Sequence, residues 1–213
     1  MSREKSLWEK LSISLPIITS LATCYLTYQI GDNQNKISKL EFAPIFILKK
    51  SLEYDEKSKT YHTERLTISN EGYPIQNFER DVKTFLLLKK TTNTDSIEVL
   101  IPIIYFWVGY KANGGKGILS EMYGKDNNTN EFNLSNQVTE LNKKNKDEII
   151  SMKIISTVKI SYVEADGERK ESYYKNEQLT TKDEVMKLEN ETLKKSKIDI
   201  ENIKIDDLLI LKN

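Results

Sequence analysis

Residues Ile150–Tyr162 read ISMKIISTVKISY, and apolar and polar side chains alternate along most of this stretch. The apolar positions that share one face are Ile150, Met152, Ile154, Val158, Ile160 and Tyr162. The polar positions on the opposite face are Ser151, Lys153, Thr157, Lys159 and Ser161. Because successive strand residues point to opposite faces, the pattern predicts a β-strand with one buried and one solvated face, which is typical of antiparallel sheets.

The segments around this strand extend it into a sheet. Asp166-Gly167 is a tight-turn signal, and Arg169–Tyr174 then returns as the partner strand of a hairpin. Earlier segments with the same β-prone apolar character are Phe42–Leu52, Tyr61–Ser69, Val82–Leu88 and Ile97–Trp107. The second of these ends in Asn70-Glu71-Gly72, which is a turn signal. Strands and helices do not alternate, which argues against a parallel sheet. The sequence therefore predicts a mainly β protein with an antiparallel β-sandwich-like domain over residues 41–178.

Two further segments differ from this strand pattern. Gly109–Lys146 is rich in Gly, Asn and Lys and is predicted mainly as loops. Thr181, followed three residues later by Glu184, matches a capping box that would open a helix. Residues 179–213 are therefore predicted as a short C-terminal helical segment.

The N-terminus has a different character from the rest of the chain. Leu11–Ile30 reads LSISLPIITSLATCYLTYQI, twenty positions without a formal charge. As a helix this segment spans about 30 Å, the thickness of a bilayer core. Trp8 and Tyr28 lie near its two ends, where membrane proteins place amphipathic rings. The pattern predicts a transmembrane anchor over residues 1–31, kinked at Pro16 and followed by a polar stalk over residues 32–40.

The same apolar segment is compatible with three alternatives to a retained anchor. They are a cleaved signal peptide, a lipoprotein signal that ends at Cys24, and the buried helix of a soluble protein. Thr19, Thr23 and Thr27 are spaced four residues apart and share one helix face. Such a hydroxyl stripe can pack helices into a homo-oligomer, but the hydroxyls can instead bond carbonyls of their own helix.

The order of these parts resembles two groups of proteins. Leu66–Gly72 (LTISNEG) is similar to a strand end that is common in immunoglobulin-like sandwich domains. The charged start, single span, polar stalk and β domain resemble the layout of uncharacterised single-pass membrane proteins of Gram-positive bacteria. These resemblances imply a β-sandwich at a bacterial plasma membrane, and they transfer no functional residue. Basic residues are slightly more numerous before the span (Arg3, Lys5, Lys10) than after it (Lys36, Lys39), which favours a β domain outside the cell.

Composition and motifs exclude several function classes. Lys+Arg and Asp+Glu are both 32, so the net charge gives no affinity for nucleic acid. His62 is the one histidine, which excludes a multi-histidine metal site within one chain. Gly115-Lys116 does not complete a phosphate loop, because Tyr110 and Gly117 occupy positions that need glycine and Ser/Thr. No catalytic residue, cofactor or metal is therefore predicted.

An aromatic cluster beside the glycine-rich segment is the candidate partner surface. It comprises Tyr105, Trp107, Tyr110 and Lys116. The alternative is that these rings pack in the core. The expected function is a non-enzymatic binding or scaffolding module, attached to the lipid bilayer, that binds an unknown protein or cell-envelope partner. The alternative function is a ligand-sensing membrane effector with a cytoplasmic β domain and a pore- or assembly-forming helix.

Overall fold

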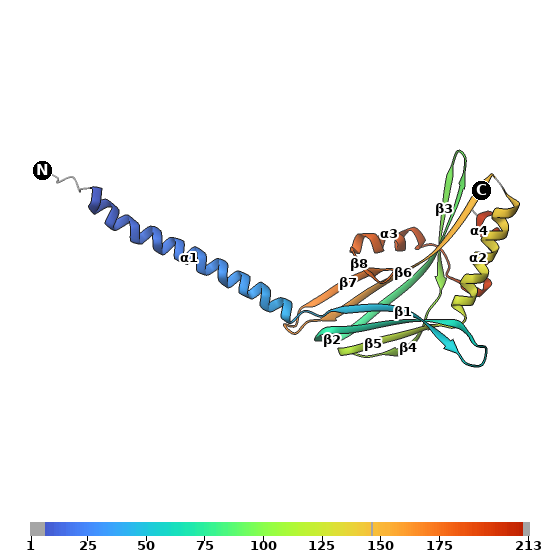
Figure 1. Ribbon diagram of the computed structural model, residues 1–213, viewed down its shortest axis with the longest axis horizontal. Coiled ribbons are helices and arrows are strands. Elements are labelled where there is room, and N and C mark those ends of the chain that lie inside the picture. Colours follow the sequence, from blue (N-terminus) through green and yellow to red (C-terminus); the bar gives the residue numbers. More distant parts are fainter. Residues whose placement is uncertain (1–6, 146, 211–213) are drawn as a thin grey trace. The chain divides into compact units, whose positions relative to one another are not determined.

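The computed structural model describes residues 7–145 and 147–210, and it divides the chain into two units, residues 1–43 and 44–213. The second unit contains nine strands that pair almost entirely antiparallel, with few helices (Figure 1). One two-residue pair is parallel and joins Ile103–Ile104 to Ile198–Asp199. The predicted mainly β, antiparallel character of the domain is confirmed.

The strand β2 (Thr60–Thr92) is the longest and belongs to two sheets. Its first part pairs with β1 (Phe46–Asp55) and β5 (Gly115–Gly124), and β5 also pairs with β4 (Trp107–Lys111). We call these four strands sheet A. The second part of β2 pairs with β3 (Ser96–Ile104) and β6 (Glu148–Val163). These strands, with β7 (Arg169–Lys175), β8 (Gln178–Thr180) and β9 (Ile198–Asp199), form sheet B.

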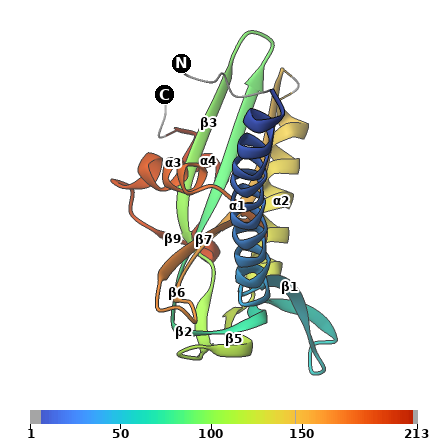
Figure 2. The same cartoon turned by 90° about the vertical axis from the view of Figure 1, so that its left-hand side faces the viewer.

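The chain passes from sheet A to sheet B within one continuous strand. The prediction of two separate strands, with a turn at Asn70-Glu71-Gly72 between them, was therefore wrong. Register shifts occur between Asn70 and Ile75 and between Gln76 and Glu79, and Asn77 has a left-handed φ of 51°. Such bulges bend a strand, which lets the two parts of β2 belong to different sheets. The strand runs from the hairpin with β1 to the hairpin with β3 (Figures 1 and 2).

Two apolar clusters form the core, and they lie along the same face of sheet B. The first packs sheet A against sheet B and includes Leu66, Ile68, Phe78, Leu119 and Ile160. The second packs sheet B against α2 (Asn127–Lys144) and the C-terminal residues, and includes Leu86, Leu88, Leu134, Ile200 and Ile205. The domain is thus sandwich-like over only part of sheet B, because a helix replaces the second sheet over the rest.

The segment predicted as loops, Gly109–Lys146, is mostly regular structure. It contains most of β4, all of β5 and the 18-residue helix α2, so that prediction was wrong. The predicted start of the next helix is confirmed, since the Thr181 hydroxyl accepts a hydrogen bond from the Glu184 N–H at the start of α3 (Lys182–Thr192). The chain then forms β9, a 3-10 turn over Ile200–Asn202 and α4 (Ile205–Ile210).

The first unit is dominated by one helix, α1 (Leu7–Glu41), of 35 residues. It includes Pro16 and continues through the segment predicted as a stalk. Among the residues that the structure describes, no helix is both long enough and apolar enough to cross a membrane. The predicted transmembrane anchor is therefore not supported, since Ser, Thr and Gln side chains recur through Leu11–Ile30 and dilute its hydrophobicity. The side chain of Trp8 lies outside the described residues.

Two hydroxyls of the α1 stripe, those of Thr19 and Thr23, bond carbonyls of their own helix. The Thr19 hydroxyl lies 3.0 Å from the carbonyl oxygens of both Leu15 and Pro16, and the Thr23 hydroxyl donates to the Thr19 carbonyl over 2.8 Å. These contacts match the prediction of bonding within the helix. The hydroxyl protons of Thr19 and Thr23 are therefore already used within the helix.

Candidate ligand pocket

The outer face of sheet A carries an array of aromatic and charged side chains. Cross-strand pairing aligns Trp107 with Tyr123 and then with Arg65, and it aligns Tyr110 with Glu121. Trp107 and Tyr110 are 44% and 49% exposed. Alternate residues of a strand share a face, so β4, β5 and β2 present these groups together.

Arg65 is held at the centre of this outer face. Its guanidinium carbon lies 5.0 Å from the centre of the Tyr123 ring. The guanidinium also pairs with the carboxylates of Glu53 and Glu121, the latter at 3.1 Å. The charge of Arg65 is therefore neutralised, while its position fixes one face of the Tyr123 ring.

A pocket of about 460 Å³ opens at the end of this face. Its aromatic walls are Trp107, from the start of β4, and Tyr123, from the end of β5. The other lining residues come from the β5–α2 turn, the first turn of α2, and the β9 and 3-10 region; they are Lys125, Asp126, Asn130, Asp199 and Glu201. Three chain segments that are remote in sequence thus meet at one cavity.

Asp126 has an unusual backbone and a free side chain. It is the N-cap residue of α2, with φ 56° and ψ 9°, and its carboxylate accepts no capping hydrogen bond. An aspartate at this position normally accepts a bond from the first turn of the helix. Here the left-handed backbone directs the main chain into α2, and the carboxylate lines the pocket instead.

The electrostatic balance of the pocket is negative. Asp126, Asp199 and Glu201 contribute three carboxylates against the single ammonium of Lys125. The N-terminus of α2 adds about half a positive elementary charge, which is too little to reverse the sign. Within residues 7–145 and 147–210, none of these four groups forms an ion pair. The arrangement suits a ligand that is positively charged.

A buried polar cluster lies close to the pocket and does not contribute to its lining. Tyr105 is only 2% exposed, and its hydroxyl donates to the Glu131 carboxylate over 3.1 Å. Burial and the Glu64 and Glu131 carboxylates together raise the pKa of Tyr105. The Asn127 side-chain oxygen accepts the Glu64 N–H over 2.9 Å, which ties α2 to β2.

Glu64 is destabilising in its charged form. Burial raises the pKa of its carboxyl, and the Lys50 ammonium 3.9 Å away only partly offsets this. The folded state therefore binds this proton more tightly than the unfolded chain. Stability falls as the pH rises from the unfolded pKa, about 4.3, through the folded pKa.

Replacing Glu64 with Gln should therefore stabilise the domain at neutral pH. After allowance for partial solvent exposure, we expect a gain on the order of 0.5 kcal/mol in the free energy of unfolding. The gain should shrink to a small fraction near pH 4, because the wild-type carboxyl is mostly protonated in both states below its unfolded pKa of about 4.3. Urea denaturation at both pH values measures it, with Glu56→Gln as an exposed control. A gain that is the same at both pH values contradicts the assignment.

The residues of the predicted partner surface are only partly brought together. Trp107 lines the pocket, Tyr110 lies beside it on the outer face of sheet A, and Tyr105 belongs to the core. Lys116 lies seven residues along β5 from Tyr123, about 23 Å at the usual strand rise. Tyr123 was not predicted, because it alternates with apolar residues as any strand residue does. The pocket's carboxylates were not predicted either, because they carry no local signal.

Other polar groups of the domain have structural roles. His62 bridges the hydroxyls of Thr60 and Thr129, with 2.8 Å between Nδ1 and the Thr129 oxygen. In the β6–β7 turn, carboxylate oxygens of Glu164, Asp166 and Glu168 lie within 4.8 Å of one another. Glu168 already pairs with Lys170, and exposed acidic groups of this kind are common without a metal.

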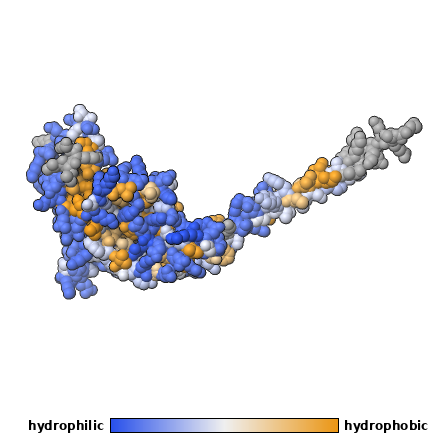
Figure 3. Space-filling model, turned by 180° about the vertical axis from the view of Figure 1, so that it is seen from behind, coloured by the Kyte–Doolittle hydropathy of each residue, from blue (hydrophilic) through white to orange (hydrophobic). Residues whose placement is uncertain are grey.

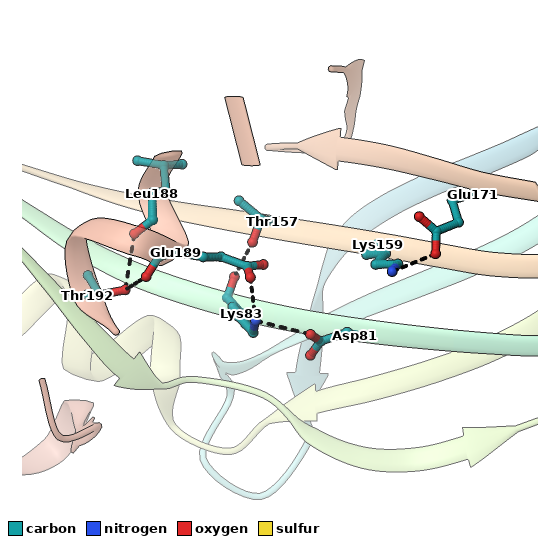
Figure 4. Close-up of polar contacts among 8 residues, drawn as sticks. All are labelled: Asp81, Lys83, Thr157, Lys159, Glu171, Leu188, Glu189 and Thr192. Atoms are coloured by element: carbon teal, nitrogen blue, oxygen red, sulfur yellow. Dashed lines mark hydrogen bonds and ion pairs between the residues drawn. The ribbon is translucent and has the colours of Figure 1, made fainter. Parts of the chain in front are cut away.

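A second cavity, of about 430 Å³, lies beside α3 on the other face of sheet B. Figure 4 shows the polar contacts that hold this region, including Lys83 with Glu189 at 2.6 Å and with Asp81 at 3.2 Å. The Thr157 hydroxyl donates to the Lys83 carbonyl over 3.4 Å. The Lys83 ammonium is thus neutralised by Asp81 and Glu189, and the contact with Glu189 attaches α3 to the sheet.

The segment Leu66–Gly72, which resembles an immunoglobulin-like strand end, lies inside the continuous strand β2. In place of ending a strand, it contributes Leu66 and Ile68 to the core between the sheets. No protein-family model matches this chain, and no curated protein matches it either.

Proposed function

We propose that this chain is a non-enzymatic binding module that α1 attaches to a lipid membrane, while the β domain presents the pocket and the outer face of sheet A to a partner. The observation that carries the proposal is the exposure of α1. Its described large apolar side chains that are more than half exposed are Leu15, Ile17, Ile18, Leu21, Tyr25, Leu26, Tyr28, Ile30, Ile37 and Leu40. Figure 3 shows the most apolar of them gathered in one stretch of the helix.

So many exposed apolar side chains indicate that lipid or another protein buries this part of α1. Burial of one Leu or Ile side chain is worth about 1.5–3 kcal/mol, and soluble monomers rarely leave a contiguous apolar surface of this size in water. Lipid is favoured over protein because the Thr19 and Thr23 hydroxyls are already satisfied inside the helix. Tyr25 and Tyr28 suit a position near the headgroups. The effector alternative, which needs helices to assemble through these hydroxyls, is less favoured for the same reason.

The binding role of the domain is supported by its outer face. Trp107 and Tyr110 are exposed rings held on strands, and rigid aromatic side chains are the most frequent anchors of partner surfaces. His62, the only histidine, is bonded to the hydroxyls of Thr60 and Thr129 and lines neither of the two cavities described above, so it is not placed as a general base beside either of them.

Vesicle flotation tests the attachment. The full chain should float with phosphatidylcholine vesicles in a density gradient, and a variant carrying Ile17→Gln, Ile18→Gln and Leu21→Gln should lose at least tenfold in the floating fraction. The matched control replaces Ile149, Leu179 and Leu193 with Gln, since these side chains are 66–75% exposed on the second unit. The control should float like the unchanged chain. A full chain that stays at the bottom as a discrete oligomer would show that further copies, in place of lipid, cover α1.

A further inference from the structure

We propose that the pocket between β4, the β5–α2 turn and the 3-10 turn binds an organic cation, an ammonium or guanidinium group carried by the partner. This inference rests on the proposed binding role of the β domain and names the chemistry that the site would recognise. Its elements are the ring of Trp107, the ring of Tyr123, and the carboxylates of Asp126, Asp199 and Glu201.

The aromatic walls supply one half of the recognition. A cation over the face of a Trp or Tyr ring gains about 0.5–1 kcal/mol at an exposed site and about 2 when desolvated. Trp107 is 44% exposed, so its ring remains open to a ligand. One face of Tyr123 already holds the Arg65 guanidinium at 5.0 Å, which shows that this ring is suited to a cation. Arg65 does not repel a second cation strongly, because Glu53 and Glu121 balance its charge.

The carboxylates supply the other half. The Asp126 carboxylate caps no helix N–H, and the Asp199 carboxylate accepts the Glu201 N–H over a long 3.4 Å. Three carboxylates outweigh both the Lys125 ammonium and the partial charge of the α2 N-terminus. An anionic ligand is therefore repelled, although a helix N-terminus by itself would favour one.

The spacing of the acids favours an organic cation over a metal ion. Within residues 7–145 and 147–210, the only three acidic groups whose oxygens gather within 4.8 Å lie in the β6–β7 turn. The three carboxylates of the pocket are therefore not gathered around one point, as the ligands of a bound metal ion would be. A volume of about 460 Å³ falls in the range of small-molecule sites and accommodates an alkylammonium chain with its headgroup among the acids.

Trp107 gives a direct readout of binding. The chain has two tryptophans, so the Trp8→Phe variant leaves Trp107 as the sole indole. The full-length variant, in neutral detergent, is titrated with tetramethylammonium, Nα-acetyl-lysine amide and Nα-acetyl-arginine amide. We expect a saturating change in Trp107 fluorescence, and at least tenfold weaker binding of 3,3-dimethylbutanol, a neutral analogue of choline. Tighter binding of the amino-acid amides identifies a protein side chain as the source of the cation, and tighter binding of tetramethylammonium identifies a small amine.

Charge removal then separates the pocket from the rest of the surface. Asp126→Asn with Glu201→Gln should weaken cation binding about tenfold, because Asn tolerates the left-handed backbone and only the charges are lost. Lys125→Gln should tighten it. The matched control is Glu56→Gln with Glu191→Gln, two exposed acids outside the pocket. Equal binding of the neutral analogue, or unchanged binding by the Asp126/Glu201 variant, overturns the inference. Flotation does not depend on this pocket, so failure of one proposal is distinguishable from failure of the other.

Discussion

Replacing Asn70 with Ala should lower the free energy of unfolding of the β domain by about 3 kcal/mol. Asn70 is fully buried, and its side chain makes four hydrogen bonds. Its oxygen accepts the N–H groups of Ile45 and Gly72, each over 3.0 Å. Its amide donates to the carbonyls of Tyr73 and Gly115 over 2.7 and 3.0 Å. Alanine leaves four backbone groups without these partners at the point where β2 leaves sheet A, and urea denaturation measures the loss.

The Asn70→Asp variant distinguishes the two hydrogen bonds that the side chain accepts from the two that it donates. The carboxylate keeps the bonds from Ile45 and Gly72 but faces the carbonyl oxygens of Tyr73 and Gly115 without a proton to donate. Burial and these carbonyls should raise the pKa of the new carboxyl, so its cost grows above about pH 4 and shrinks as the pH falls. The Ala variant should show a deficit that is the same at neutral pH and near pH 4. An Asp variant as stable as wild type at neutral pH contradicts this account of Asn70.

The same residue explains where sequence reasoning failed. Asn70-Glu71-Gly72 has the local chemistry of a turn, and a turn was predicted. In the structure the Asn70 side chain bonds to Gly72 and Tyr73, as it would in a turn, and also to Ile45 and Gly115 from neighbouring segments. Those contacts hold the chain extended. No local pattern distinguishes the two outcomes, because the deciding partners are 25 and 45 residues away.

The alternation in Ile150–Tyr162 was informative because one face of β6 meets the core along its length. Ile150, Val158 and Ile160 are all at most 3% exposed. The helix α2 gave no comparable signal, since its buried residues are only Asn127, Leu134 and Val138. Its apolar stripe is short, since Leu134, Val138 and Leu141 are its members in the core and the first two turns of the helix bury Asn127 in place of an apolar side chain.

The candidate pocket was predictable only in part. Trp107 was identified because aromatic residues suit recognition, and it does line the cavity. Its acidic partners, Asp126, Asp199 and Glu201, come from the β5–α2 turn and from the C-terminal region. The parallel pairing of β9 with β3 brings Asp199 and Glu201 to the pocket. Such long-range placement depends on the packed fold and leaves no trace in local composition.

The turn that positions Asp126 depends on Gly124. A Cβ at this position would lie 1.8 Å from the Asn127 side-chain nitrogen and 2.7 Å from the Tyr105 carbonyl oxygen. Asn127 is fully buried and cannot swing into solvent. Gly124→Ala should therefore destabilise the domain by about 3 kcal/mol, the upper range for overpacking. Gly31→Ala makes the same chemical change in α1 with nothing within 4 Å, and it should leave unfolding of the β domain unchanged.

A double-mutant cycle with Asn127→Ala locates the source of this cost. Asn127→Ala alone should cost about 1 kcal/mol, because the Glu64 N–H loses its acceptor. In that background the clash with the Asn127 amide is gone, and the contact with the Tyr105 carbonyl oxygen remains. Gly124→Ala should then cost about 1 kcal/mol in place of about 3, a coupling of about 2 kcal/mol. Additive costs would mean that the main-chain contact with Tyr105 dominates, and that Asn127 does not set the geometry of the β5–α2 turn.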